Sequence, residues 1–488
     1  MGSEEGEPRS KLKQHFSLVS LCAIAVTTGE SWVVLGNSLA FAILNGGSTG
    51  VIYGFIVDTF CYCIVAASIA ELASSMPTAG TVYHWALVTG GRHGRICSWF
   101  AGFWNLFAWI VGTASLVSVM ALQLIAIYAA FHPGVSIQNW HTFLAFVACC
   151  WCCCLIVAFG NKLLPIIESF GAFFILSGFA ISIVVCVVYP HIRRKPYASN
   201  AFVWKEWKND TGWSSDGFAF CLGMLNAAFA VCAPDIPAHL AEEIPRPKHN
   251  VPIAIAAQYA VSFVTGLCYL VSIFYVTTNF ATIAAANSAF PLALIYLEAT
   301  GSHSATAGLL VLTFIPTFIG AIGAFTIASR TIWALSRDDV VPASKFFAKI
   351  DASQAPRNAT IFVGLATTAL GCIFLNSARA FNAIVSSFVN HSLTSLSYLA
   401  AILPHLLGGR RNITRGPFWM PKWIGFAVNT FSCLYLIVFI VIFCFPATLP
   451  VSTENMNYAS VIVSGFTLIA TVWWMVKRDT WMPELPEF

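Results

Sequence analysis

Residues 27–32 read Thr-Thr-Gly-Glu-Ser-Trp and place a carboxylate, Glu30, inside an apolar run that extends from residue 17 to 44. A membrane-spanning helix needs about 20 mostly apolar residues. A carboxylate at the centre of a bilayer costs about 3 kcal/mol or more, so such residues are rare and mark functional sites. The segment therefore predicts a membrane-spanning protein with a polar site at depth, which is the arrangement that a transporter requires.

The composition excludes a soluble globular protein. Of 488 residues, 58% are hydrophobic and 9% are charged, whereas a soluble domain carries about 25% charged residues. We therefore predict an all-α integral membrane protein with one domain of twelve helices, residues 17–476, between tails at 1–16 and 477–488. Residues 280–300 are expected to form a short helix or loop on one face. The apolar runs that predict the helices are 17–44, 49–73, 96–131, 142–160, 164–189, 217–243, 251–279, 303–335, 359–377, 380–403, 423–446 and 457–476.

The positions of Lys and Arg predict the topology, because these residues favour the cytoplasmic side. With the N-terminus inside, nineteen of the 25 lie in inside gaps and tails and six lie outside. Both termini are therefore expected in the cytoplasm. The long outside loop, 190–216, contains Asn209-Asp210-Thr211, which predicts glycosylation of Asn209. The charged start of the chain and the length of the first run argue against a cleaved signal peptide.

The first and sixth runs are both interrupted. The first contains Gly29 and Glu30, and the sixth contains Asn226 followed by Pro234-Asp235-Ile236-Pro237. Interruptions at matching places, five helices apart, predict broken helices in an inverted repeat. Exposed half-helix ends could hold a carboxylate at one end and a cation at the other. Ordinary Gly and Pro kinks are the alternative.

The sixteen cysteines do not form a disulfide framework or a metal site. Most lie in apolar runs, including five within residues 149–154, and polar support for a metal is missing there. We expect them to pack as small hydrophobic residues, with palmitoylation near a helix end as the alternative. No cofactor and no nucleic acid is predicted.

Three long motifs, in order along the chain, resemble the amino acid–polyamine–organocation superfamily. They are SIAELASSMPTAGTVYHW (68–85), HLAEEIPRP with VPIA (239–247, 251–254), and RTIWALSRDDVVP with PRNA (330–342, 356–359). Within the superfamily, GW, GFAF, GPFW and PVSTENMNY (212–213, 217–220, 416–419, 450–458) resemble the fungal amino acid/choline transporter group, which includes choline and γ-aminobutyrate permeases. The resemblance implies a LeuT-like fold, with helices 1–5 and 6–10 as repeats, helices 11 and 12 added, and proton-driven uptake.

The resemblance also implies where substrate binds, which is against the unwound parts of helices 1 and 6, with walls from helices 3, 8 and 10. An ammonium group would be held by aromatic faces, by backbone carbonyls and by a carboxylate. Packing or lipid contact is the alternative for each aromatic residue. On this chain the implied binding residues are Thr28, Gly29, Glu30, Ser31, Trp32, Trp104, Asn226, Ala227 and Phe229.

Two positions depart from the pattern of choline permeases, which carry a neutral residue at the place of Glu30 and a Trp at the place of Phe229. Both departures weaken the case for choline itself. Glu30 could be the counter-ion of a cationic substrate, or the proton-carrying group, because desolvation favours a protonated carboxyl. A Glu paired with backbone in a packed bundle is the third interpretation.

Acidic and basic residues near the cytoplasmic helix ends predict gate pairs that form when that side closes. The acids are Glu71, Glu242 and Glu243, and the bases lie among Arg92, Arg95, Arg246, Arg330 and Arg337, the last followed by Asp338. Surface pairs worth under about 1 kcal/mol are the alternative. Asp58 and Glu168 are further buried acids without an assigned partner, and Asp235 is expected to cap the second half of helix 6.

We therefore predict a monomeric secondary transporter, most simply a proton symporter, that moves an amino acid, γ-aminobutyrate, choline or a related amine by alternating access. A non-transporting nutrient sensor with the same fold is the alternative, although the short tails disfavour it. A membrane enzyme is disfavoured because the eleven His are scattered. The plasma membrane is expected, and the vacuolar membrane is the alternative.

Overall fold

The computed structural model describes residues 14–29, 31–37, 39, 44–132, 135–277, 290–352, 354–376, 378–453 and 455–483. Within these residues the regular secondary structure is helical, apart from an isolated β-bridge between Asn45 and Asn209. The elements are α1 (Leu18–Thr28), α2 (Ser31–Asn37), α4 (Gly47–Ser75), α5 (Val82–Thr89), η1 (Gly91–His93), α6 (Gly94–Phe131), α7 (Asn139–Phe159), η2 (Asn161–Leu163), α8 (Leu164–Ile192), α9 (Asn200–Trp204), α10 (Asp216–Gly223), α11 (Leu225–Val231), η3 (Ile236–Glu243), α12 (Pro247–Val276), α14 (Pro291–Thr300), α15 (His303–Arg337), α16 (Ser344–Phe347), α17 (Arg357–Asn376), α18 (Ala378–Ile384), α19 (Ser387–Leu407), α20 (Lys422–Ile442) and α21 (Ala459–Lys477).

Among the described residues, eleven helical segments are long and apolar enough to cross a membrane. They match eleven of the twelve predicted runs, with ends that differ by a few residues. The tenth run, 380–403, is occupied by α18 and α19. The 21 residues of α19 would reach across a bilayer, but the helix carries the polar residues Asn390, His391, Ser392 and Thr394 and is not among the eleven segments. The predicted short helix in 280–300 is confirmed over Pro291–Thr300, and 278–289 lie outside the described residues.

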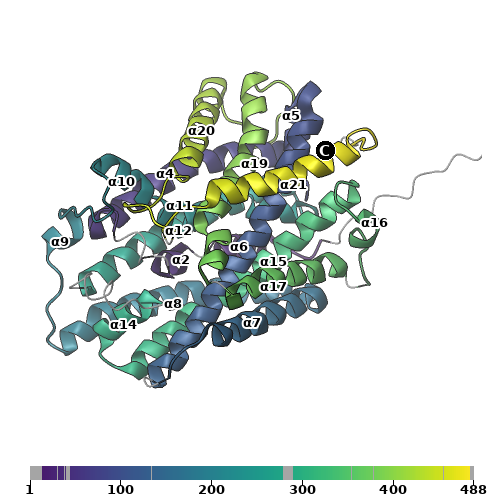
Figure 1. Cartoon of the computed structure of the whole chain (residues 1–488). Helices are drawn as coiled ribbons and strands as arrows, with labels where there is room; N and C mark the ends of the chain where they lie inside the picture. The colour runs from purple at the N-terminus through teal and green to yellow at the C-terminus, as the bar shows by residue number, and fades with distance from the viewer. Residues whose placement is uncertain are drawn as a thin grey trace, which may run out of the picture.

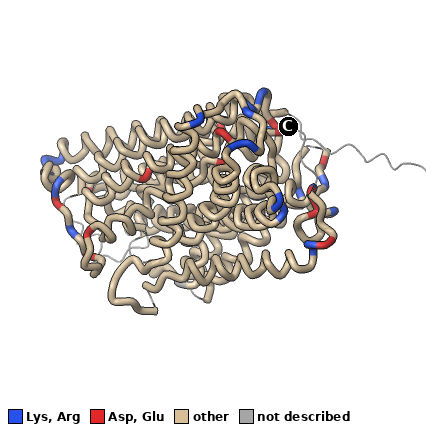
Figure 2. The backbone as a smooth tube through the Cα atoms, turned by 90° about the horizontal axis from the view of Figure 1, so that it is seen from above, with Lys and Arg blue, Asp and Glu red and all other residues tan. Residues whose placement is uncertain are grey.

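Charged residues gather at the two ends of the helical bundle, and the middle is mostly uncharged (Figure 2). The loop with α9 and α10 lies at one end, and α16 and the end of α21 lie at the other (Figure 1). The start of the described chain joins this second end, because the Phe16 amide donates to Glu243 O at 3.2 Å. Lys477 at the end of α21 bonds Asp339 there at 2.6 Å. Both ends of the described chain therefore lie on the same side of the bundle.

Close helix packing positions the centre of the bundle. A Cβ on Gly323 of α15 would lie 2.0 Å from Thr28 Oγ1 of α1, and a Cβ on Gly171 of α8 would lie 2.7 Å from Thr27 Cγ2. The hydrophobic effect does not drive association between helices in lipid, so close contact through small residues stabilises the bundle instead. These two glycines therefore allow α8 and α15 to pack closely against the end of α1.

The sixteen cysteines are all free thiols. Cys150, Cys153 and Cys154 are buried against α15 and α17, where Cys154 Sγ lies 3.5 Å from Thr360 O. The prediction that this cluster packs as small hydrophobic residues is confirmed for its buried members.

Candidate functional site

Both predicted breaks are present in the structure. In the first membrane segment α1 ends at Thr28 and α2 begins at Ser31. In the sixth, α11 ends at Val231 and η3 begins at Ile236. The Ser31 hydroxyl lies 2.9 Å from Gly29 O and 3.0 Å from Ala230 O, so it joins the two breaks.

Breaking helix 6 frees three successive carbonyls, and side chains from a neighbouring helix donate to two of them. Tyr259 OH donates to Val231 O at 2.5 Å, and Gln258 Nε2 donates to Ala233 O at 3.2 Å. Tyr398 OH lies 3.3 Å from Cys232 O. Unpaired backbone groups are not tolerated in hydrocarbon. These contacts from α12 and α19 therefore stabilise the non-helical backbone at this position.

A cavity of about 60 Å³ lies where the two breaks meet. This volume has room for a few water molecules and is smaller than the about 300–1,000 Å³ of typical ligand pockets. The site is therefore closed around a small space in this conformation. Its walls come from α1, α2, α6, α11, the break of helix 6, α12, α15 and α19, through Thr28, Gly29, Val34, Ala108, Trp109, Gly112, Leu116, Phe229, Ala230, Cys232, Ala233, Ile236, Gln258, Ala324, Asn390 and Thr394.

The described wall of this cavity is uncharged and carries two aromatic rings, Trp109 and Phe229. Three buried polar atoms on it make no hydrogen bond within the described residues: Thr28 Oγ1, Trp109 Nε1 and Gln258 Oε1. Buried polar atoms almost always have a partner. The three residues that carry these atoms line the same small cavity.

Only some of the predicted site residues line the cavity. Thr28, Gly29 and Phe229 line the cavity. Ser31 joins the breaks, as described above, while Asn226 and Ala227 are buried in α11 beside the cavity without lining it. Glu30 lies outside the described residues.

Two predicted aromatic residues face elsewhere. Trp32 is fully buried against Tyr269, with ring centroids 5.0 Å apart, and against Phe179. Trp104 packs toward α21, where its Nε1 donates to Thr467 Oγ1 at 2.9 Å. The structure therefore replaces Trp32 and Trp104 with Trp109 as the aromatic partner of Phe229 at the cavity.

Sequence reasoning missed Trp109, Gln258, Asn390 and Thr394. The helices 3 and 10 that supply three of them were expected as walls, but the inward face of each helix was not known. Residues 104 and 109 lie on one helix and are separated by five positions, which rotates them to different faces. Four-residue spacing from Ala108 through Gly112 to Leu116 marks the inward face of α6.

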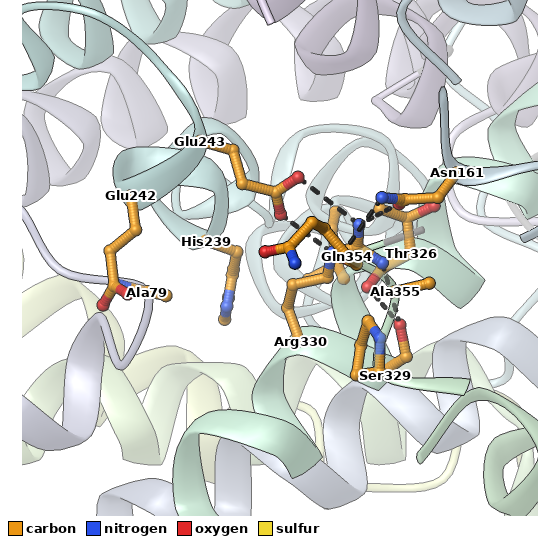
Figure 3. A network of polar contacts seen from close by, with 12 residues as sticks. Ala79, Asn161, His239, Glu242, Glu243, Thr326, Ser329, Arg330, Gln354 and Ala355 are labelled. Atoms are coloured by element: carbon orange, nitrogen blue, oxygen red, sulfur yellow. Dashed lines mark hydrogen bonds and ion pairs between the residues drawn. The ribbon is translucent and has the colours of Figure 1, made fainter. Parts of the chain in front are cut away.

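At the end of the bundle where both ends of the described chain lie, ion pairs join η3 to α15, and Figure 3 shows the pair between Glu243 and Arg330. Arg330 Nε lies 3.0 Å from Glu243 Oε1, and Arg330 Nη2 donates to Asn161 Oδ1 at 2.6 Å. Arg337 binds both oxygens of Glu242, at 2.9 and 3.1 Å. We call these four charged residues, together with Asp338, the ion-pair cluster.

Asp338 extends the cluster to α5. Its Oδ2 accepts from His84 Nε2 at 2.6 Å and from Tyr83 OH at 2.8 Å. Burial disfavours its ionised form, but the hydrogen bond and charge of His84, with the charge of Arg337, outweigh burial and hold the pKa of the carboxyl below its ordinary value. The predicted gate residues Glu242, Glu243, Arg330, Arg337 and Asp338 therefore meet in one place.

Glu71 belongs to a different cluster. It accepts from Arg410 Nη2 at 2.6 Å, and the same guanidinium donates to Met420 O at 2.9 Å. The sequence assigned no specific partner to Glu71, and Arg410 was not among the bases considered, because only the folded loop between α19 and α20 brings Arg410 to the end of α4. Arg95 also pairs elsewhere, with the carbonyls of Arg478 and Trp481.

The remaining buried acids have specific partners. Tyr435 OH donates to Asp58, and Thr27 Oγ1 donates to Glu168. Asp235 accepts from three side chains, described below, and makes no capping hydrogen bond to η3. The prediction that Asp235 is a helix cap is wrong, because its carboxylate turns toward α6 and α19 instead.

The sequon residue Asn209 is half-buried. Its Nδ2 donates to Trp213 O at 2.9 Å and to Asp216 Oδ1 at 3.1 Å. In the folded loop the amide nitrogen that a glycan would occupy is therefore hydrogen-bonded to protein. Glycosylation of Asn209 remains a prediction.

Comparison with known proteins agrees with this architecture. A model of the family "Amino acid permease" matches residues 16–466. A choline transporter of Saccharomyces cerevisiae is 29% identical over 98% of this chain and 84% of its own length. A 7-keto 8-aminopelargonic acid transporter of the same yeast is 26% identical over 95% and 92%, and the amino-acid permease BAT1 of Arabidopsis thaliana is 26% identical over 97% and 87%. The chain therefore belongs to the amino acid permease family and is an integral membrane transporter of the permease type, not an enzyme.

Proposed function

We propose that this protein moves a small nitrogenous solute by alternating access, and that the cavity between the two breaks is its substrate site. The observation that carries the proposal is a cavity bounded by both broken helices and by two aromatic residues, whose wall residues Thr28, Trp109 and Gln258 also carry buried polar atoms without a partner among the described residues. Non-helical backbone at membrane depth is tolerated where it lines such a site.

The chemistry of the cavity favours a solute with an ammonium or amide nitrogen. Trp109 and Phe229 present rings that can hold a cation. Gln258 carries an amide oxygen without a partner among the described residues. The relatives carry names of an amine, an amino-containing acid and amino acids, which share this nitrogen chemistry. We propose an amino acid, γ-aminobutyrate, choline or a related amine as the class.

Glu30 directly follows Gly29, a residue of the cavity wall. We propose it as the group that couples transport to protons, or as the counter-ion of a cationic solute. This role rests on its place in the sequence and on the uncharged character of the described wall.

The ion-pair cluster supplies a closing contact on one side. It joins η3, the second half of helix 6, to α15, so movement of this half-helix would open the cavity toward that end. In the closed state of the transporter, removing one partner of such a buried pair costs about 3–5 kcal/mol. Opening into water hydrates all the charges together and avoids most of this cost.

We further propose that α19 is a twelfth span, that the first ten spans form two inverted repeats, and that the protein works as a monomer. Both described chain ends lie beside the ion-pair cluster, which supports the expected placement of both termini in the cytoplasm. The plasma membrane is the proposed location and the vacuolar membrane the alternative.

The test is uptake into proteoliposomes of a radiolabelled panel that contains choline, γ-aminobutyrate, 7-keto-8-aminopelargonic acid and common amino acids. An imposed pH gradient is compared with no gradient, for wild type and Glu30→Gln. We expect at least one solute to accumulate, and Glu30→Gln to abolish accumulation driven by the gradient. Accumulation at the wild-type rate would exclude Glu30 as coupling group or essential counter-ion. Failure of every solute would favour the sensor alternative.

A further inference from the structure

A buried carboxylate and a buried imidazole form a pair next to the cavity wall. Asp235 and His239 lie one turn apart on helix 6, with His239 Nε2 3.0 Å from Asp235 Oδ2. Their side chains are 0% and 1% exposed. A buried ionisable pair at membrane depth is expensive and marks a functional site.

Each oxygen of Asp235 is used as an acceptor. Tyr398 OH donates to Oδ1 at 2.5 Å, and Asn105 Nδ2 donates to Oδ2 at 2.9 Å in addition to His239. Three such donors favour the ionised carboxylate over the protonated one. An ionised Asp235 buried at this place requires a cation beside it.

His239 is placed to be that cation. Its second nitrogen, Nδ1, lies 3.3 Å from Thr331 Oγ1, and the same hydroxyl lies 3.0 Å from Ile327 O. A hydroxyl has one proton. When that proton is donated to Ile327 O, Oγ1 accepts from Nδ1, and both imidazole nitrogens carry protons.

The arrangement also accommodates the neutral imidazole. If Nδ1 loses its proton, the Thr331 hydroxyl can rotate away from Ile327 O and donate to Nδ1. Nε2–H still donates to Asp235. The ring keeps a complete set of hydrogen bonds in both states, and the net charge of the pair falls from zero to minus one.

The pair connects the cavity to the ion-pair cluster. Trp109, a wall of the cavity, packs edge-to-face on His239 with centroids 5.7 Å apart. On the other side η3 continues directly to Glu242 and Glu243, and Thr331 is next to Arg330 on α15. The ionisable and charged groups around the pair, from all elements packed on it, are Tyr398, Tyr259, Cys232, Asp58, Glu242, Glu243 and Arg330.

We propose that the Asp235–His239 pair is a proton-binding site of the transport cycle, separate from Glu30. With the proton on His239 the pair is neutral and η3 stays docked on α15. When Nδ1 releases the proton to water on the side of the ion-pair cluster, the unbalanced charge of Asp235 favours hydration and displaces η3. This inference rests on the proposed transport function.

Cys232, a buried residue of the cavity wall, reports opening without any solute. Purified protein in nanodiscs is treated with a water-soluble methanethiosulfonate, and mass spectrometry measures the labelling rate of Cys232. Rates are taken in mildly acidic and mildly alkaline buffer and expressed as variant over wild type at each pH. This ratio removes the pH dependence of labelling that variant and wild type share.

The two members of the pair should respond in opposite directions. In His239→Gln, Asp235 stays unbalanced, so we expect Cys232 to be labelled faster than in wild type in acidic buffer and equally in alkaline buffer. In Asp235→Asn no unbalanced anion forms, so labelling should stay slow and fall below wild type in alkaline buffer. His405→Gln, a matched buried histidine on Glu71, should give a ratio of one at both pH values.

The proposal is supported if the labelling ratio of His239→Gln exceeds one only in acidic buffer and the ratio of Asp235→Asn falls below one only in alkaline buffer. Ratios that do not change with pH, or the same change in both variants, would overturn it and leave a structural pair. If His239→Gln fails to fold, the alkaline result for Asp235→Asn decides alone. Because no solute is present, a negative result here is distinct from a failure of the uptake panel.

Discussion

Replacing Arg330 by Met should open the end of the transporter that the ion-pair cluster closes. Arg330 and Glu243 are 0% and 2% exposed and lie 3.0 Å apart. Removing one partner of a buried pair leaves an uncompensated charge and costs about 3–5 kcal/mol. In the open state Glu243 meets water and loses little, so nearly the whole cost falls on the closed state.

The shift in population follows from this difference. Since about 1.4 kcal/mol corresponds to a factor of ten, the closed state should lose roughly two to four powers of ten relative to the open state. Hydrogen–deuterium exchange in nanodiscs, followed on peptides that cover η3, measures that population through the amides released on opening. We expect faster exchange of η3 and unchanged exchange of α4.

Two controls make the result specific. Arg357→Met removes a pair with Asp351 in which Arg357 is 41% exposed, and an exposed pair is worth under about 1 kcal/mol. The double variant Arg330→Met/Glu243→Gln removes both buried charges and should return exchange toward wild type. Unchanged η3 exchange in the single variant, or a double variant that exchanges as fast as the single one, would refute the reasoning.

Three further predictions test the cavity and its surroundings. Trp109→Ala should raise the KM for the transported solute by about 3–30-fold, from a lost cation–π contact of about 0.5–2 kcal/mol, while Trp104→Ala should change it less than twofold; equal effects would contradict the assignment of the wall. Gly323→Ala places a Cβ 2.0 Å from Thr28 Oγ1 and should cost about 1–3 kcal/mol, visible as a lower thermal midpoint with reduced uptake; an unchanged midpoint would contradict the close packing. Because the folded pKa of Asp338 is lowered, its contribution to stability should be complete above the ordinary aspartate value of about 3.9 and lost only as the pH falls below it; thermal melts across this range should show an acid-side loss that Asp338→Asn removes, and a wild-type loss beginning near neutral pH would contradict it.

Much of the fold was predictable because membrane insertion imposes a simple pattern. Spanning helices must be long and apolar, so most of their limits followed from hydropathy within a few residues. The breaks at Gly29 and at Pro234 were also visible, since Gly and Pro interrupt a helix for local reasons. The polar residues of α19 obscured the same pattern, because Ser392, Thr394 and Ser395 are buried in protein instead of facing lipid.

The partners of charged and aromatic residues could not be predicted from the sequence. Glu71 meets Arg410 across more than three hundred positions, and only the fold of the α19–α20 loop brings them together. Trp109 and Trp104 differ only in helix face, which depends on how α6 packs on α15 and α19. Asp235 follows Pro234 at the start of η3, where a capping residue is expected. Its carboxylate oxygens instead accept hydrogen bonds from side chains of α6 and α19.

The most direct test of the account is a cryo-electron microscopy map of the protein in nanodiscs, saturated with a solute that the uptake assay identifies. We predict density for that solute between the end of α1 and the break after α11, in contact with Trp109 and Phe229, in a cavity enlarged beyond about 60 Å³. Continuous first and sixth helices, or solute density at another place with this cavity still closed, would contradict it.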